Sequence, residues 1–237
     1  MELREVQIPS TDSALVGLLG IPDGAGPFPV VVVVHEVFGI DESMRAQVAK
    51  LASLGYLAIM PNLFSRGGAR KCLTATFKAL TAQKGQAFDD VSDARSFALA
   101  LPQASQKVGV IGFCMGGAFA LVLAGRGYDV SAVNYGRLPE NLDEILSVAC
   151  PIVGSFGGSD SSLKGAATTL ENALTRHDVK HDVKEYPNTG HAFMNPVQAG
   201  PPLLKPILKR VLGIAPAPEQ AKDAWARIDA FFKQELA

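Results

Sequence analysis

Short apolar runs alternate along the chain with longer segments in which apolar residues recur every three or four positions. The most apolar run, residues 28–34, holds five consecutive valines and is typical of a strand buried on both faces of a sheet. Further strands are predicted at residues 4–8, 14–20, 56–60, 107–113, 130–134, 151–156 and 179–186. Helices are predicted at residues 41–54, 88–101, 115–124, 161–174 and 218–236.

Strands that alternate with helices predict an α/β fold with a mostly parallel sheet of about eight strands and helices on both faces. The 237 residues contain no Ser/Gly linker, so we expect one domain over residues 1–237. Residues 196–218 are rich in proline and are expected to form an insertion near the entrance of the site. In such folds the reactive groups lie at the carboxyl ends of the strands, so we expect the functional residues there.

Composition narrows the class of protein. Hydrophobic residues make up 48% of the chain, which is enough for a substantial core. The net charge of −1 argues against a nucleic-acid partner, and no apolar run approaches the length of a membrane span. The first residues are charged and the three cysteines are too few for a disulfide framework, so we expect a cytoplasmic protein. We expect a monomer that needs no metal or cofactor.

The strongest chemical signal is the segment Gly112-Phe113-Cys114-Met115-Gly116, which follows a predicted buried strand and begins a helix rich in small residues. This is the nucleophile-elbow pattern with cysteine in place of serine. A helix N-terminus favours the thiolate, the reactive form of cysteine. A buried structural thiol is the alternative, but the two flanking glycines favour a nucleophile.

A thiol nucleophile needs a base and a group that orients the base. His191 follows the last predicted strand of the sheet and is the best candidate for the base; an ordinary loop histidine is the alternative. Asp160 follows the strand at 151–156, where it could orient the base, cap the next helix, or do both.

His35 and Glu36 end the valine-rich strand, where an ionisable pair is costly unless it faces a site. Glu36 is therefore a candidate for function and His35 a supporting group. The backbone N–H of Val37 is expected beside the elbow, where it could form an oxyanion hole with the N–H of Met115.

Residues 35–39, 112–117, 157–160 and 190–195 together resemble the dienelactone hydrolase (carboxymethylenebutenolidase) family. The resemblance runs from about residue 10 to residue 195 and includes the last helix. It implies the three-layer α/β-hydrolase sandwich and a catalytic triad of Cys114, His191 and Asp160. It also implies that Glu36 contacts the resting thiol and helps to deprotonate it when substrate binds. Family members hydrolyse enol-lactones such as dienelactone in the breakdown of chlorinated aromatics.

The family's substrate-binding positions are matched only in part. The family holds the substrate carboxylate with two arginines, and the place of one is taken by Asn195. The other could be Arg66 or Arg70. The resemblance also places Tyr135 and Phe38 among the residues that contact substrate.

The sequence therefore predicts a cysteine-dependent hydrolase of a small lactone or ester, acting through an acyl-enzyme. One alternative is an esterase or thioesterase with an unrelated substrate, and another is a ligand-binding pseudo-hydrolase without turnover. An amidotransferase-type protein is disfavoured, because there a glutamate follows the catalytic histidine by two residues, whereas Phe193 stands at that place here.

Overall fold

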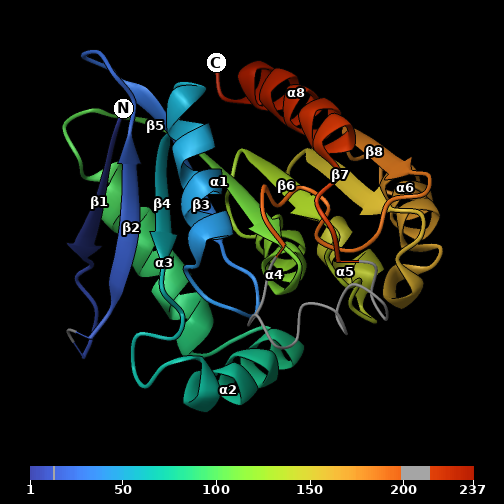
Figure 1. The fold of residues 1–237 in the computed structure, drawn as a ribbon, viewed down its shortest axis with the longest axis horizontal. Coiled ribbons are helices and arrows are strands. Elements are labelled where there is room, and N and C mark those ends of the chain that lie inside the picture. Colours follow the sequence, from blue (N-terminus) through green and yellow to red (C-terminus); the bar gives the residue numbers. More distant parts are fainter. Residues whose placement is uncertain (13, 199–213) are drawn as a thin grey trace.

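The computed structural model describes residues 1–12, 14–198 and 214–237, which build one eight-stranded sheet (Figure 1). The strands are β1 (Glu2–Gln7), β2 (Val16–Ile21), β3 (Phe28–Val34), β4 (Leu57–Pro61), β5 (Ala104–Phe113), β6 (Val130–Asn134), β7 (Ile152–Gly157) and β8 (His181–Tyr186). The helices are α1 (Glu42–Ser53), α2 (Ala69–Ala82), α3 (Gln86–Leu99), α4 (Met115–Leu123), α5 (Leu142–Leu146), α6 (Ala166–Arg176) and α8 (Pro218–Glu235).

The sheet order is β1-β2-β4-β3-β5-β6-β7-β8. β1 pairs with β2 and β2 with β4 in antiparallel fashion, whereas every pairing from β4 to β8 is parallel. α1 and α8 cover one face and α3 and α4 the other (Figure 1). The prediction of an α/β-hydrolase sandwich with a mostly parallel sheet is confirmed. The parallel strands all end at one edge, so residues that follow β3, β5, β6, β7 and β8 come together there.

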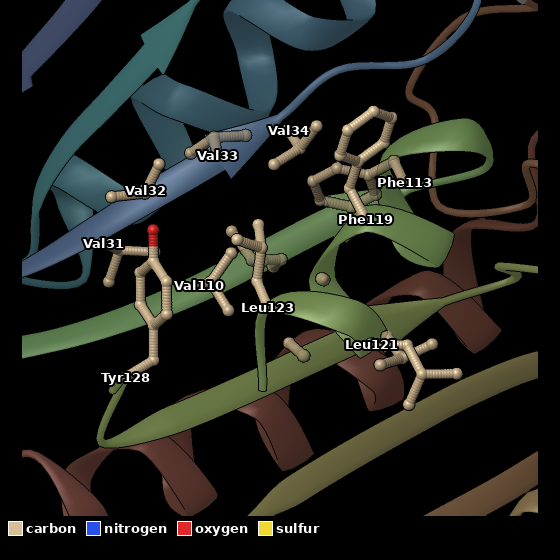
Figure 2. Close-up of a cluster of buried hydrophobic side chains, with 14 of the residues drawn as sticks. Val31, Val32, Val33, Val34, Val110, Phe113, Phe119, Leu121, Leu123 and Tyr128 are labelled. Carbon is tan, nitrogen blue, oxygen red and sulfur yellow. The ribbon is translucent and has the colours of Figure 1, made fainter. Parts of the chain in front are cut away.

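The centre of the core lies where β3 and β5 pack against α4. The valines at 30–34 have no exposed surface, as expected for a strand between two parallel neighbours. Every residue of α4 is buried, and Figure 2 shows Phe119 and Leu123 of this helix beside the valines of β3 and Val110 of β5. This packing holds in place the ends of β3 and β5, which are followed by the candidate residues Glu36 and Cys114.

Several predicted boundaries need correction. The single helix expected at residues 161–174 is wrong: a 3₁₀ turn, Ser161–Leu163, comes first, and α6 starts only after Gly165, whose φ of 75° interrupts the helix. The short helix α5 was not predicted. Of the Pro-rich stretch expected to form an insertion, residues 199–213 lie outside the described residues. In the described part of the chain, no helix is both long and apolar enough to cross a membrane.

Candidate active site

Cys114 stands on a sharp turn between β5 and α4. Its φ of 55° and ψ of −116° are unusual for a residue with a side chain, a strain of about 1–3 kcal/mol of the kind found at functional sites. The turn requires glycine on both sides. A Cβ on Gly112 would lie 1.8 Å from the Gly116 carbonyl oxygen, and one on Gly116 would lie 2.0 Å from the carbonyl oxygen of Val34. The thiol is therefore held, partly exposed, at the N-terminus of a buried helix.

His191 and Asp160 come from the ends of neighbouring strands, β8 and β7, and they meet in a buried contact. Nδ1 of His191 lies 2.5 Å from Oδ2 of Asp160. The other carboxylate oxygen of Asp160 accepts hydrogen bonds from the backbone N–H and the hydroxyl of Ser162, at 3.0 and 2.6 Å. Because Nδ1 donates to the carboxylate, Nε2 is the nitrogen available as a base. Asp160 thus both caps the 3₁₀ turn and orients His191.

The pKa values of this pair reflect the contact. Burial opposes the charge on His191, but hydrogen bonding to Asp160 and interaction with Cys114 outweigh burial and raise the pKa of His191 to about 10. Burial likewise opposes the charge on Asp160, yet the hydrogen bonds from His191 and Ser162 hold the pKa of Asp160 below its usual range. These contacts therefore stabilise the imidazolium that His191 becomes when Nε2 accepts a proton.

Cys114 is close enough to His191 to contribute, by hydrogen bonding and by charge, to the raised pKa of the imidazole. The three residues of the expected triad are thus brought to one place from the ends of β5, β7 and β8.

His35 and Glu36 follow β3 and are both buried, with 0% and 2% of their surface exposed. Nε2 of His35 accepts the N–H of Leu63 at 3.1 Å, so Nδ1 carries the hydrogen and donates to the carbonyl oxygen of Glu36 at 2.6 Å. Burial lowers the pKa of His35 to about 4, which keeps the ring neutral. His35 is a structural support for the backbone at Glu36.

The carboxylate of Glu36 is held by an amide. Nδ2 of Asn195 donates to both carboxylate oxygens, at 3.2 and 3.0 Å, and Asn195 is itself 2% exposed. Behind it, Nε2 of Gln47 donates to the carbonyl oxygen of Met194 at 2.9 Å and to Oδ1 of Asn195 at 3.4 Å. Burial raises the pKa of Glu36 to about 7, although the hydrogen bond from Asn195 and the charge of His191 act in the opposite direction.

Gln47 was missed by the sequence reasoning. It lies on α1 between Met44 and Val48, on the face that packs against the sheet. A polar residue on an otherwise apolar helix face is the signal that could have found it.

Tyr135 follows β6 and packs against His191. Its φ of 41° is strained, and its ring centroid lies 5.2 Å from that of His191. The hydroxyl is buried close to Glu36, yet it has no hydrogen-bond partner of standard geometry among the described residues. A buried hydroxyl without a partner is costly and is available to a ligand.

The backbone N–H groups of Val37 and Met115 lie on adjacent strand ends. Val34 of β3 pairs in register with Gly112 of β5. Val37 lies three residues after Val34, and Met115 lies three residues after Gly112. Neither group donates to an acceptor within the described residues. Both N–H groups therefore keep their hydrogen-bonding capacity within the described part of the chain.

Comparison with known proteins agrees with this geometry. The model of the dienelactone hydrolase family matches residues 15–236. The carboxymethylenebutenolidase of Pseudomonas putida is 30% identical over 206 residues, which cover 82% of this chain and 87% of that protein. The chain belongs to the dienelactone hydrolase family. It is thus a hydrolase of the carboxylic ester class.

Other members of the dienelactone hydrolase family match over nearly the whole chain. A candidate carboxymethylenebutenolidase of Methylorubrum extorquens is 29% identical over 248 residues, covering 97% of this chain and 80% of that protein. The crystal structure of a candidate dienelactone hydrolase from Klebsiella pneumoniae has a TM-score of 0.80 and 27% identity, with 98% of each chain covered. The dienelactone hydrolase of Anabaena variabilis, at 18% identity and a TM-score of 0.74, shares the fold over 100% of this chain and 99% of its own.

Arg66 and Arg70, the two arginines predicted as candidates for substrate binding, differ in their contacts and exposure. Arg66 binds Asp12 through Nε and Nη2, and its Nη1 donates to Asp90 at 2.6 Å, so each of its three nitrogens is held by an aspartate. Arg70 is exposed in the first turn of α2. Phe38 is partly exposed after β3. Within the described part of the chain, no group of three His, Cys, Asp or Glu side chains is arranged to hold a metal.

Proposed function

We propose that this protein hydrolyses a small ester or lactone through a triad of Cys114, His191 and Asp160 and an acyl-enzyme. The observation that carries the proposal is the 2.5 Å contact between His191 and Asp160 at strand ends next to the strained turn of Cys114. This arrangement supplies a nucleophile, a base with one free nitrogen, and a group that fixes the base.

In the proposed first half-reaction, the thiol of Cys114 gives its proton to Nε2 of His191. The thiolate attacks the carbonyl carbon, a C–S bond forms, and the carbonyl electron pair moves onto oxygen. The N–H groups of Val37 and Met115 stabilise this oxyanion. Collapse breaks the C–O bond, and the alkoxide leaves with the proton from His191; in a lactone it stays attached to the acyl group.

In the second half-reaction, His191 removes a proton from water, which attacks the thioester carbon. The C–S bond then breaks, the acid is released, and Cys114 recovers its proton from His191. The net reaction consumes one ester and one water and gives one acid and one alcohol. We infer that Glu36, buried beside this site with a pKa of about 7, helps to deprotonate the thiol when substrate binds, and that the proton then passes to Nε2 of His191, which gives it to the leaving group.

The experiment is to measure hydrolysis of p-nitrophenyl acetate, a short acyl thioester, and cis- and trans-dienelactone by wild type and Cys114→Ala. Cys72→Ala is the matched control, because Cys72 lies on α2, outside the proposed triad. We expect turnover that Cys114→Ala abolishes and Cys72→Ala retains, with an acyl adduct on Cys114 in mass spectra of quenched reactions. Full activity in Cys114→Ala contradicts the mechanism. Ligand binding without any turnover by wild type would support the non-catalytic alternative.

A further inference from the structure

We propose that the acyl group of the substrate is uncharged, and that the site discriminates against esters that carry a carboxylate close to the reacting carbonyl. This inference rests on the proposed function, since it concerns the acyl group transferred to Cys114. Four features of the described residues carry it: the partner of Glu36, the fixed orientation of that partner, the charges around Glu36, and the position of Glu36 relative to the oxyanion hole.

The first feature is a buried carboxylate that has no cationic partner in direct contact among the residues that the structure describes. Glu36 is 2% exposed, and its two oxygens are held by the neutral amide of Asn195. A neutral amide satisfies the hydrogen bonds of a carboxylate but leaves its charge uncompensated. When Glu36 is ionised, its contact with Asn195 therefore carries a net negative charge.

The second feature is that the amide of Asn195 is held with its Nδ2 towards Glu36 and its Oδ1 towards Gln47. Its Nδ2 is directed at both oxygens of Glu36, and its Oδ1 accepts from Gln47, which is anchored on the carbonyl oxygen of Met194. Gln47 thereby fixes which end of the amide faces Glu36. Rotating the amide would bring its oxygen against the carboxylate of Glu36 and would break its hydrogen bonds to Glu36 and from Gln47.

The third feature is the surrounding charge. The two charged groups that affect Glu36 most are His191, which stabilises its ionised form, and Asp41, which opposes it. His191 is already paired with Asp160. Arg66 is bound to two aspartates and cannot turn to the site without leaving the buried carboxylate of Asp90 unpaired.

The fourth feature is proximity. Val37, a proposed oxyanion donor, is the residue next to Glu36, so a carbonyl bound to its N–H lies beside the segment that carries this carboxylate. A second carboxylate a few bonds from that carbonyl would approach Glu36 in a region of low dielectric constant, where like charges repel strongly. The hydroxyl of Tyr135, buried without a partner, instead offers a neutral donor to an uncharged polar group.

The test compares two substrates that differ in one negative charge and one methyl group, the p-nitrophenyl monoester of glutarate and its methyl ester. Their leaving groups are identical, and hydrolysis without enzyme is subtracted. At pH 8, where Glu36 is ionised, we expect kcat/KM for the methyl ester to exceed that for the anion by about 10-fold or more. Equal rates, or a faster rate for the anion, would overturn the inference.

Variants of one position identify the cause of the selectivity. Asn195→Arg places a cation next to Glu36 and is expected to reduce or invert the ratio of the two kcat/KM values. Asn195→Gln keeps a neutral amide and is the matched control, for which the ratio should stay in favour of the methyl ester. A ratio that does not respond to Asn195→Arg contradicts the electrostatic origin.

The inference and the proposed function fail in different ways. If neither ester is hydrolysed in a manner that depends on Cys114, the proposed function is wrong and the inference falls with it. If the anion is preferred and Cys114 is required, only the inference is wrong. Arg137→Gln, at an exposed residue two positions after Tyr135, and Lys205→Gln, outside the described residues, would then show which cation binds the carboxylate.

Discussion

Nδ1 of His191 and Oδ2 of Asp160 are 2.5 Å apart, and their side chains are only 10% and 0% exposed. A short contact between a base and a carboxylate in a buried setting fixes the tautomer of the base and favours its protonated form.

Asp160→Asn is predicted to lower kcat by roughly 10²- to 10⁴-fold, as expected when the base adopts the wrong tautomer. The amide oxygen can still accept the N–H of Ser162, so the 3₁₀ turn should remain. Loss of the carboxylate charge should also lower the pKa of His191, which can be followed by NMR titration. Asp143→Asn is the matched control, because Asp143 contacts His177 at the surface and should not affect kcat. An Asp160→Asn enzyme with wild-type kcat would exclude Asp160 from the triad.

Gly116→Ala is predicted to destabilise the fold by about 3 kcal/mol or more, because the new methyl group would overlap the backbone of Val34. Gly67→Ala is the control: there the new Cβ meets only the flexible side chain of Lys71, at 3.1 Å, and little change is expected. Urea denaturation measures both. Equal stability of the two variants would mean that the elbow tolerates a side chain at 116.

Glu36→Gln is predicted to stabilise the protein at pH 8 while reducing its activity. Burial raises the pKa of Glu36 from 4.5 to about 7, so the folded state binds more protons than the unfolded state between these values. The free energy of unfolding therefore falls as the pH rises from 4.5 to 7 and stays low above 7, by an amount on the order of 2–3 kcal/mol. Glutamine does not ionise, so the gain should be present at pH 8 and should disappear towards pH 4.5.

The measurement is urea denaturation of wild type and Glu36→Gln at pH 5 and pH 8, beside esterase rates at pH 8. Glu185→Gln, at an exposed position of β8, is the control and should change stability at neither pH. A gain for Glu36→Gln that is the same at both pH values would show that packing, rather than the buried charge, causes it.

Much of the fold and of the candidate site could be predicted because its signals are local. Five consecutive valines define β3 with the bounds 28–34, and Gly112 and Gly116 mark the elbow through a steric requirement that lies within a few residues. Asp41 was expected to begin α1, and its side chain does accept the N–H of Met44 at 2.9 Å. The position of the candidate reactive residues, just after the parallel strands, follows from the topology of the sheet alone.

What could not be predicted depends on pairs that are distant in sequence. Asn195 and Glu36 are 159 positions apart, and no local pattern states that the amide serves the carboxylate rather than a substrate. The helix expected at 161–174 is interrupted because Gly165 adopts a positive φ. The amino-acid sequence does not show whether a glycine will adopt this conformation. Arg66 could not be distinguished from Arg70 by sequence, because its partners Asp12 and Asp90 come from separate segments.

Arg66→Ala is predicted to destabilise the protein by about 2–4 kcal/mol, because it leaves the carboxylate of Asp90, which is 1% exposed, without its cation. The remaining hydrogen bond to Asp90 from Gln86, at 3.0 Å, offsets only part of the loss. Arg70→Ala, at an exposed position, is the matched control and should leave stability unchanged. Adding Asp90→Asn to Arg66→Ala removes the buried charge and should restore part of the stability. A role of Arg66 in binding substrate would give the opposite pattern, with unchanged stability and a higher KM for the glutarate monoester.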